Sequence, residues 1–404
     1  MIKDLIKYVS KNFFLNFTRS ILSIISITFG IMAIFALLSF GQGLTKYVND
    51  MAEDMGVDTL TAMPRGAGGP GATGTYLTKS DVDFINRQRG IDNAVGFVFN
   101  QAEIKVNLKE RGKWFYIIGM PVDSQNYHFA REMFSMFDIV DGRYFSIGEK
   151  GKVILGYNYM FDGKIFQRAL KTGDRIYINE KRFEIIGFFD EVGSPQDDGQ
   201  IYLSTQDAEG LFNLKDKYGM IYIKAQQNTN PSDLAEYLTD RLRRHKNQKL
   251  GQEDFNIETL ESQIKMFNDL VNLLNGILIL IALVSVLVAG VNIANTMYTT
   301  VMERTKEIGI MKSIGAKNNY IRNIFMIESG FIGICGGILG VILGYIVASI
   351  IGYIANIAGF GMLTPYFPMW LVIACILFAT LIGSLSGFLP ANQASKLKPV
   401  DALR

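Results

Sequence analysis

Cysteine and histidine are almost absent from this 404-residue chain, and their scarcity excludes several kinds of site. The two cysteines, Cys335 and Cys375, both lie inside apolar runs, so no disulfide framework is expected. The two histidines, His128 and His245, are far apart and have no cysteine neighbours, which argues against a His/Cys zinc site. The formal net charge is only +2, so we expect no general attraction to nucleic acid.

Nucleotide-binding and catalytic motifs are also missing. The Gly-rich stretch RGAGGPGATGTY spaces Gly69 and Gly74 like a phosphate-binding loop, but Thr75 stands where such a loop needs lysine. A flexible surface loop is the better interpretation. The acidic turn Asp197-Asp198-Gly199 offers fewer oxygen ligands than a calcium site requires. No nucleophile, base and orienting group can be assembled, so we predict a non-catalytic chain that holds no metal and no cofactor of its own.

Four long apolar runs dominate what the sequence does contain. A membrane-spanning helix needs about 20 mainly apolar residues. The runs that meet this length are 21–40, 270–291, 325–354 and 370–389. The first run is not a cleaved signal peptide, because it starts late and lacks a small-residue cleavage site. The chain is therefore predicted to be a multi-pass membrane protein in contact with the lipid bilayer.

Lysine and arginine near the span ends predict the orientation of the chain. The segment 1–20 has an apolar face and several cations, which is typical of an amphipathic helix on the inner membrane surface. The loop 292–324 and the tail 390–404 are also cationic, whereas 355–369 carries no lysine or arginine. The positive-inside rule then predicts that both termini and the loop 292–324 are cytoplasmic. The protein itself is predicted to lie in the plasma or inner membrane. The segment 41–269 and the short connection 355–369 face outward.

The outward segment is predicted to be a large extracytoplasmic α/β domain. Strand–helix–strand units are expected at both of its ends, which suggests a pseudo-repeat. Their predicted strands are 57–63, 94–98, 102–108, 114–119, 220–225 and 255–259, and their predicted helices are 80–89 and 231–245. Between them, 125–214 is interpreted as an inserted subdomain with strands at 152–155, 175–179, 183–189 and 201–203 and a hairpin turn at Asn179-Glu180. Helical stretches at 48–55 and 258–270 are expected to extend the first two spans as a stalk.

The cytoplasmic loop contains the most informative string, MERTKEIGIMKSIGA, from Met302 to Ala316. An apolar set of Ile308, Ile310, Met311 and Ile314 lies between charged residues, and Gly315 is an expected helix stop. The string favours either a membrane-surface helix that anchors the loop or a docking surface for a cytoplasmic partner. The candidate coupling residues are Glu303, Arg304, Lys306, Glu307, Ile308, Gly309, Met311 and Gly315.

This string resembles the coupling-helix signature of MacB/FtsX-like ABC transporter permeases. The ending LPANQASKLKPVDALR resembles the tail of the same family. The resemblance implies a homodimer that works with two ABC ATPase subunits, which would bind the ATP and magnesium. It implies mechanotransmission, in which ATP-driven movement of the ATPases is passed to the outer domain. It also implies a porter-like part, 41–124 with 215–269, and a sabre-like insertion, 125–214. No Walker motif occurs in the chain, which begins at the amphipathic segment, so we expect the ATPase to be a separate subunit.

The third span has two further features. Its glycines form overlapping small-xxx-small steps, which allow helices to approach closely, either within one subunit or across a dimer. They are Gly333, Gly336, Gly337, Gly340 and Gly344. Glu328 is an intramembrane acid that is costly if it faces lipid. We expect it to pair with Arg322 or a backbone group, either as a structural tether or as part of the coupling.

The sequence leaves the cargo open. Efflux of drugs, peptides or lipids, with a periplasmic adaptor as a further partner, fits the four-span plan. A lipoprotein-release permease fits it equally. An FtsX-like regulator of an extracytoplasmic cell-wall hydrolase is a further alternative, although such regulators usually have a much smaller outer domain.

Overall fold

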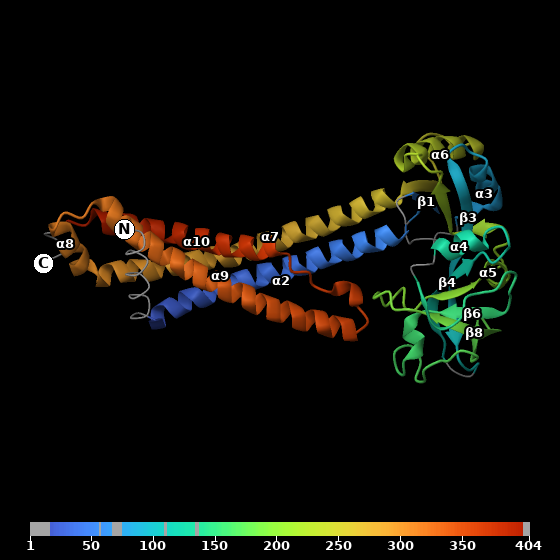
Figure 1. Ribbon diagram of the computed structural model, residues 1–404, viewed down its shortest axis with the longest axis horizontal. Coiled ribbons are helices and arrows are strands. Elements are labelled where there is room, and N and C mark those ends of the chain that lie inside the picture. Colours follow the sequence, from blue (N-terminus) through green and yellow to red (C-terminus); the bar gives the residue numbers. More distant parts are fainter. Residues whose placement is uncertain (1–16, 56–57, 67–74, 109–110, 134–136, 399–404) are drawn as a thin grey trace. The chain divides into compact units, whose positions relative to one another are not determined.

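The structure is a computed structural model that describes residues 17–55, 58–66, 75–108, 111–133 and 137–398. The predicted N-terminal amphipathic helix and the Gly-rich loop lie largely outside these residues. The chain divides into two compact units (Figure 1). One contains Met1–Lys46, Asp269–Ala355 and Leu363–Arg404, and the other contains Tyr47–Asn268 and Asn356–Met362.

The first unit is a bundle of apolar helices. Within the described residues, four helices are long and apolar enough to cross a membrane: α2 (Phe17–Met55), α7 (Leu260–Glu303), α9 (Asn318–Ile357) and α10 (Met369–Lys396). Each contains one of the four predicted runs. Helix α7 has 44 residues, so it is about 66 Å long, roughly twice the thickness of a hydrocarbon core. Because α2 and α7 continue past their apolar runs without a break, the predicted helical extensions of the first two spans are confirmed.

Five of the seven glycines of α9, those named from the sequence, pack against helices of the same chain. A Cβ added at Gly340 would lie 2.7 Å from Ile31 Cβ of α2, and one at Gly333 would lie 2.5 Å from the carbonyl oxygen of Ala379 on α10. Gly336 and Gly344 also face α2, and Gly337 also faces α10. Of the two alternatives for these glycines, packing within one subunit is therefore the one that this chain shows. Around them, α2, α7, α9 and α10 share one apolar core with α8 (Thr305–Ser313).

The second unit is built on a ten-stranded sheet. Its strand order is β12-β1-β11-β3-β4-β9-β6-β8-β5, with β7 beside β3 and β8. The strands are β1 (Thr59–Pro64), β3 (Ile91–Lys105), β4 (Lys113–Met120), β5 (Ile139–Gly142), β6 (Lys152–Leu155), β7 (Arg175–Ile178), β8 (Lys181–Phe189), β9 (Ile201–Ser204), β11 (Met220–Ala225) and β12 (Phe255–Thr259). The helices of this unit include α3 (Lys79–Asn86), α4 (Tyr127–Met133), α5 (Thr205–Phe212) and α6 (Pro231–His245).

The two predicted strand–helix–strand units lie together at one end of the sheet and interleave, an arrangement that was not predicted. Strand β11 lies between β1 and β3, and β1 lies between β11 and β12. This is the split arrangement in which each unit brackets one strand of the other. Helices α3 and α6 lie together beside these strands (Figure 1) and close an apolar core that includes Leu60, Ile85 and Leu238. Helix α6 begins as predicted, with the Asn230 side chain accepting the Ser232 N–H and Pro231 at its first turn.

The sheet continues through the region that was interpreted as a separate insertion. The predicted strands 94–98 and 102–108 are one 15-residue strand, β3, because the polar pair Asn100-Gln101 lies within the ladder to β4 and does not break it. Strand β4 in turn pairs in parallel with β9. The predicted hairpin turn is confirmed, since Asn179 and Glu180 have φ of 44° and 67° between β7 and β8. The short elements α4, α5 and β5 and a two-stranded ladder of β2 (Leu77–Thr78) and β10 (Lys217–Tyr218) were not predicted.

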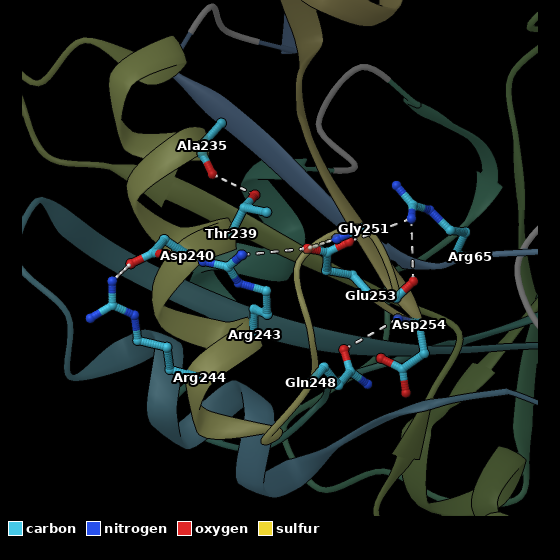
Figure 2. Close-up of polar contacts among 10 residues, drawn as sticks. All are labelled: Arg65, Ala235, Thr239, Asp240, Arg243, Arg244, Gln248, Gly251, Glu253 and Asp254. Atoms are coloured by element: carbon cyan, nitrogen blue, oxygen red, sulfur yellow. Dashed lines mark hydrogen bonds and ion pairs between the residues drawn. The ribbon is translucent and has the colours of Figure 1, made fainter.

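A charged network braces the connection from α6 to β12 (Figure 2). The Arg65 backbone N–H donates to the Asp254 carbonyl over 2.7 Å, and the Arg65 guanidinium lies 3.6 Å from the Glu253 carboxylate. Glu253 also accepts the Gly251 N–H over 3.1 Å. These contacts hold β12 against β1, and α7 begins at the residue that follows β12. Helix α7 therefore follows directly from a strand of the sheet.

Replacing Gly340 with leucine should separate α9 from α2 and lower the stability of the helical unit by about 1–3 kcal/mol, as overpacking does in dense interiors. The matched control is Gly276→Leu, because no atom lies within 4 Å of a Cβ added at that helical glycine of α7. Thermal unfolding in detergent measures both. Equal melting temperatures for the two variants would show that the close approach at Gly340 contributes nothing.

Candidate functional site

A short helix follows the second long helix at the predicted coupling string. Helix α7 ends at Glu303, α8 covers Thr305–Ser313, and α9 begins at Asn318. Arg304 lies between α7 and α8, with φ of −96° and ψ of 15°. The chain changes direction at this residue, and helical hydrogen bonding resumes directly after it. Gly315 has φ of +95°, a conformation that glycine adopts readily, and its N–H donates to the Lys312 carbonyl. The predicted helix stop is therefore confirmed.

A buried ion pair attaches the beginning of α8 to α9. The Arg304 guanidinium donates to the Glu328 carboxylate over 3.1 Å, and the two side chains are only 11% and 9% exposed. Removing one partner of such a pair leaves an uncompensated buried charge, which costs about 3–5 kcal/mol. Glu328 thus joins the coupling string to the third span.

The prediction that Glu328 pairs with Arg322 was wrong. Arg322 does not contact it, and among the described residues the buried Arg322 Nε has no hydrogen-bond partner. The reason is helical geometry. Six residues at about 100° each place Arg322 some 120° away from Glu328 around α9. Arg304, at the α7–α8 junction, lies on the face of α9 that Glu328 occupies.

A second polar contact holds the other end of α8. The Lys312 ammonium donates to the Leu397 carbonyl over 2.7 Å, and Leu397 immediately follows α10. Between the two attachments, Ile308 is fully buried, Gly309 is buried, and Met311 packs against the core of the bundle. The inner face of α8 is therefore fixed to both α9 and the end of α10.

The opposite face of α8 carries an apolar strip at its surface. Ile310 is 54% exposed and Ile314 is 81% exposed, and Met302 at the end of α7 is 74% exposed. Glu307, Ile310 and Ile314 follow the i, i+3, i+7 spacing of one helical face. We call the pair Ile310 and Ile314 the α8 strip. Exposed neighbours around it are Glu303, Lys306, Glu307 and Gly315.

The predicted apolar set therefore divides between two faces. Ile308 and Met311 point into the bundle, whereas Ile310 and Ile314 lie at the surface. The candidate coupling residues did not include Met302, Ile310 and Ile314, although Ile310 and Ile314 belonged to the predicted apolar set. Helical periodicity measured from Glu307 would have separated the two faces. A large apolar strip on a rigid, charged helix is suited to binding another protein. Among the described residues, no group of three or more His, Cys, Asp and Glu side chains could hold a metal ion.

Replacing Arg304 with methionine should destabilise the helical unit by about 3 kcal/mol, because Glu328 would then be buried without its cation. The double variant Arg304→Met, Glu328→Leu should recover most of that loss, since it leaves no unpaired charge. Chemical unfolding of the wild type, of each single variant (Arg304→Met and Glu328→Leu) and of the double variant in detergent forms a double-mutant cycle. Purely additive losses would contradict a direct interaction.

Two family models cover most of the chain. Residues 20–241 match the MacB-like periplasmic core domain, and residues 279–399 match the FtsX-like permease C-terminal domain. The first match spans the outer sheet as far as α6, and the second contains α8 and the α8 strip.

A relative matched along its whole length supports the same family. An uncharacterized ABC transporter permease of Methanocaldococcus jannaschii is 30% identical over 406 residues, covering 100% of this chain and 98% of the relative. The macrolide export ATP-binding/permease protein MacB of Marinobacter nauticus is 28% identical and covers 99% of this chain, which spans only 60% of that protein. The solved periplasmic region of MacB from Actinobacillus actinomycetemcomitans has a TM-score of 0.41 at 17% identity, covering 55% of this chain and 97% of that structure. This chain is a membrane protein that belongs to the MacB/FtsX-like family of ABC transporter permeases.

Proposed function

We propose that this chain is a non-catalytic transporter subunit that docks a separate ABC ATPase on α8 and passes the ATP-driven movement to its outer domain. The observation that carries the proposal is the α8 strip, which is exposed on a helix whose opposite face is attached at both ends. An apolar strip on a loose helix could adapt to a partner without moving anything else. A strip on a fixed helix transmits the partner's displacement to α9 and α10.

The path from α8 toward the outer sheet runs through α7. This helix is continuous from Glu303 back to Leu260, directly after β12. At its beginning, the Gln263 side chain donates to Thr61 of β1 over 2.6 Å, and Thr259 caps the helix by accepting the Ser262 N–H. A rigid helix with hydrogen-bonded contacts at its origin supports transmission by levering.

Few ionisable groups lie within the apolar helices, and this favours a lever over a solute channel. Intramembrane charges usually mark ion or substrate pathways. Between residues 325 and 354, Glu328 is the single acidic or basic side chain, and Arg304 already pairs with it. In this proposal the cargo is handled by the outer domain and need not pass between the helices. The ATPase would bind the ATP and magnesium.

For the cargo, we propose efflux of drugs, peptides or lipids, with two copies of the chain in the working assembly and a periplasmic adaptor where an outer membrane is present. The name of the Marinobacter nauticus relative supports the efflux assignment. Lipoprotein release remains the alternative with the same plan. The ten-stranded outer sheet weighs against an FtsX-like regulator of a cell-wall hydrolase, since such regulators usually have a much smaller outer domain.

We also propose that both termini and α8 are cytoplasmic and that the outer domain faces away from the cytoplasm. The distribution of lysine and arginine around the spans supports this orientation. A cysteine at Leu250, which is 83% exposed in the outer domain, should react with a membrane-impermeant maleimide in intact cells lacking an outer membrane or in spheroplasts, in a background where Cys335 and Cys375 are replaced. Reaction only after the membrane is opened would contradict the orientation.

Replacing Ile310 and Ile314 together with aspartate should reduce co-purification of the ATPase at least about tenfold, because exposed apolar anchors at the centre of an interface each contribute 1 kcal/mol or more. Reversing Glu303 and Glu307 to lysine tests the charged margin in the same assay. The control is Ile147→Asp, since Ile147 is an exposed isoleucine of the outer domain. Unchanged recovery of the ATPase by the double isoleucine variant, with normal membrane insertion, would rule out docking at the α8 strip.

A further inference from the structure

A loop of the outer domain contacts two segments that lead to the membrane helices. The Tyr47 hydroxyl, on α2, donates to the Val192 carbonyl over 2.9 Å. The Met362 N–H, in the connection between α9 and α10, donates to the Gly193 carbonyl over 2.9 Å. Tyr47, Met362 and this loop all belong to the same compact unit. Two adjacent carbonyl groups therefore receive hydrogen bonds from two segments that are distant in sequence.

The carboxylate of Asp198 fixes the pair of residues that make these contacts. It accepts the Val192 N–H over 2.7 Å and the Gly193 N–H over 3.1 Å, and the residue is 1% exposed. Burial raises the pKa of Asp198 to about 6, while the two backbone N–H groups lower it. A buried acid in an ordinary surface turn would be replaceable. Here it accepts hydrogen bonds from two adjacent backbone amide groups, and so sets the conformation of the loop.

The backbone of Asp198 is attached in turn to the body of the sheet. Its carbonyl accepts the Asn158 N–H over 3.0 Å, next to the end of β6. The Tyr159 hydroxyl, which is buried, donates to the carbonyl of the following residue, Gly199, over 3.0 Å. One residue thus connects the sheet, through its main chain, to the contact with Tyr47 and Met362, through its side chain.

Close backbone packing explains why glycine occupies position 193. Its φ is +85°, and a Cβ added there would lie 3.0 Å from the Met362 nitrogen and 3.1 Å from Gly361 Cα. A Cβ added at Gly361 would likewise lie 3.1 Å from Gly193 Cα. Two glycine backbones therefore meet directly, and a side chain at position 193 would displace the α9–α10 connection.

We propose that Val192, Gly193 and Asp198 form a joint that attaches the end of α2 and the α9–α10 connection to the outer sheet, so that these segments move with the sheet during the transport cycle. We call this set the Asp198 joint. The inference rests on the proposed lever function and assigns positioning residues to it. Through the joint, movement of the third and fourth spans would reach the sheet by a path separate from α7.

The first test needs no ATPase. Hydrogen exchange of the full chain in lipid nanodiscs, followed by mass spectrometry, reports the Met362 amide in peptides covering 356–366. In Gly193→Ala, exchange there should accelerate at least about tenfold, because the added Cβ separates the two backbones. The control is Gly148→Ala, which has a similar φ of +75° but no atom within 4 Å of the added Cβ, and its exchange at 356–366 should stay unchanged.

Two milder variants keep the test usable if Gly193→Ala fails to fold. Tyr47→Phe removes only the hydroxyl that binds the Val192 carbonyl. Asp198→Asn keeps the side-chain shape but presents an NH₂ group where one of the two backbone N–H groups needs an acceptor. Both should accelerate exchange in peptides covering 190–200. The joint would be overturned if exchange stayed at the wild-type rate over 190–200 in Tyr47→Phe and Asp198→Asn and over 356–366 in Gly193→Ala.

The second test adds the ATPase and a non-hydrolysable ATP analogue. The Gly193→Ala variant should still recover the ATPase, because α8 is untouched, but the analogue-dependent change in exchange over 190–200 and 356–366 should be lost. An identical response in the variant and wild type would overturn the joint and leave the proposed function standing. Failure of the wild-type chain to bind any ATPase would overturn the proposed function, whereas the first test would still decide the joint.

Discussion

The geometry of the candidate coupling site depends on one buried ion pair, that of Arg304 and Glu328. Two charges placed inside an apolar helical bundle are stable only when they satisfy each other, and here they are 3.1 Å apart at the junction of α7, α8 and α9. This pairing fixes where α8 begins. Lys312 fixes where it ends by binding the Leu397 carbonyl. Because both ends are fixed, Ile308 is turned into the core and Ile310 and Ile314 are left at the surface.

The surrounding helices give that fixed helix something rigid to move. Glycine at 333, 336, 337, 340 and 344 lets α9 contact α2 on one face and α10 on another. Helix α7 continues without interruption from the coupling string to the strand that closes the outer sheet. Between β12 and α8 the described chain is one helix, α7, followed by the single residue Arg304. In our account this is why a permease without a nucleotide-binding motif can respond to the nucleotide state of a partner.

Features set by local sequence were predictable. The apolar runs identified all four spans, because each is about as long as a bilayer requires. Asn230-Pro231 identified the beginning of α6, and Asn179-Glu180 identified a turn that needs two positive φ angles. These features depend on the preferences of a few neighbouring residues, which a single sequence displays.

Features set by contacts between distant residues were not predictable. Arg322 or a backbone group was the expected partner of Glu328, whereas helical rotation separates Arg322 from Glu328 and the partner is Arg304. The polar pair Asn100-Gln101 suggested a break that the ladder between β3 and β4 bridges. Asp198 was recognised as part of an acidic turn, yet its importance lies in two amide groups whose position only the folded loop defines.

The most direct test of the central claim is to purify this protein from its native membrane in mild detergent and to quantify the accompanying proteins by mass spectrometry. Our account predicts a separate ATPase with Walker motifs in a stoichiometric amount, recovered through the α8 strip. An intact preparation that contains no such ATPase would contradict it, and α8 would then have to be interpreted as a membrane-surface anchor.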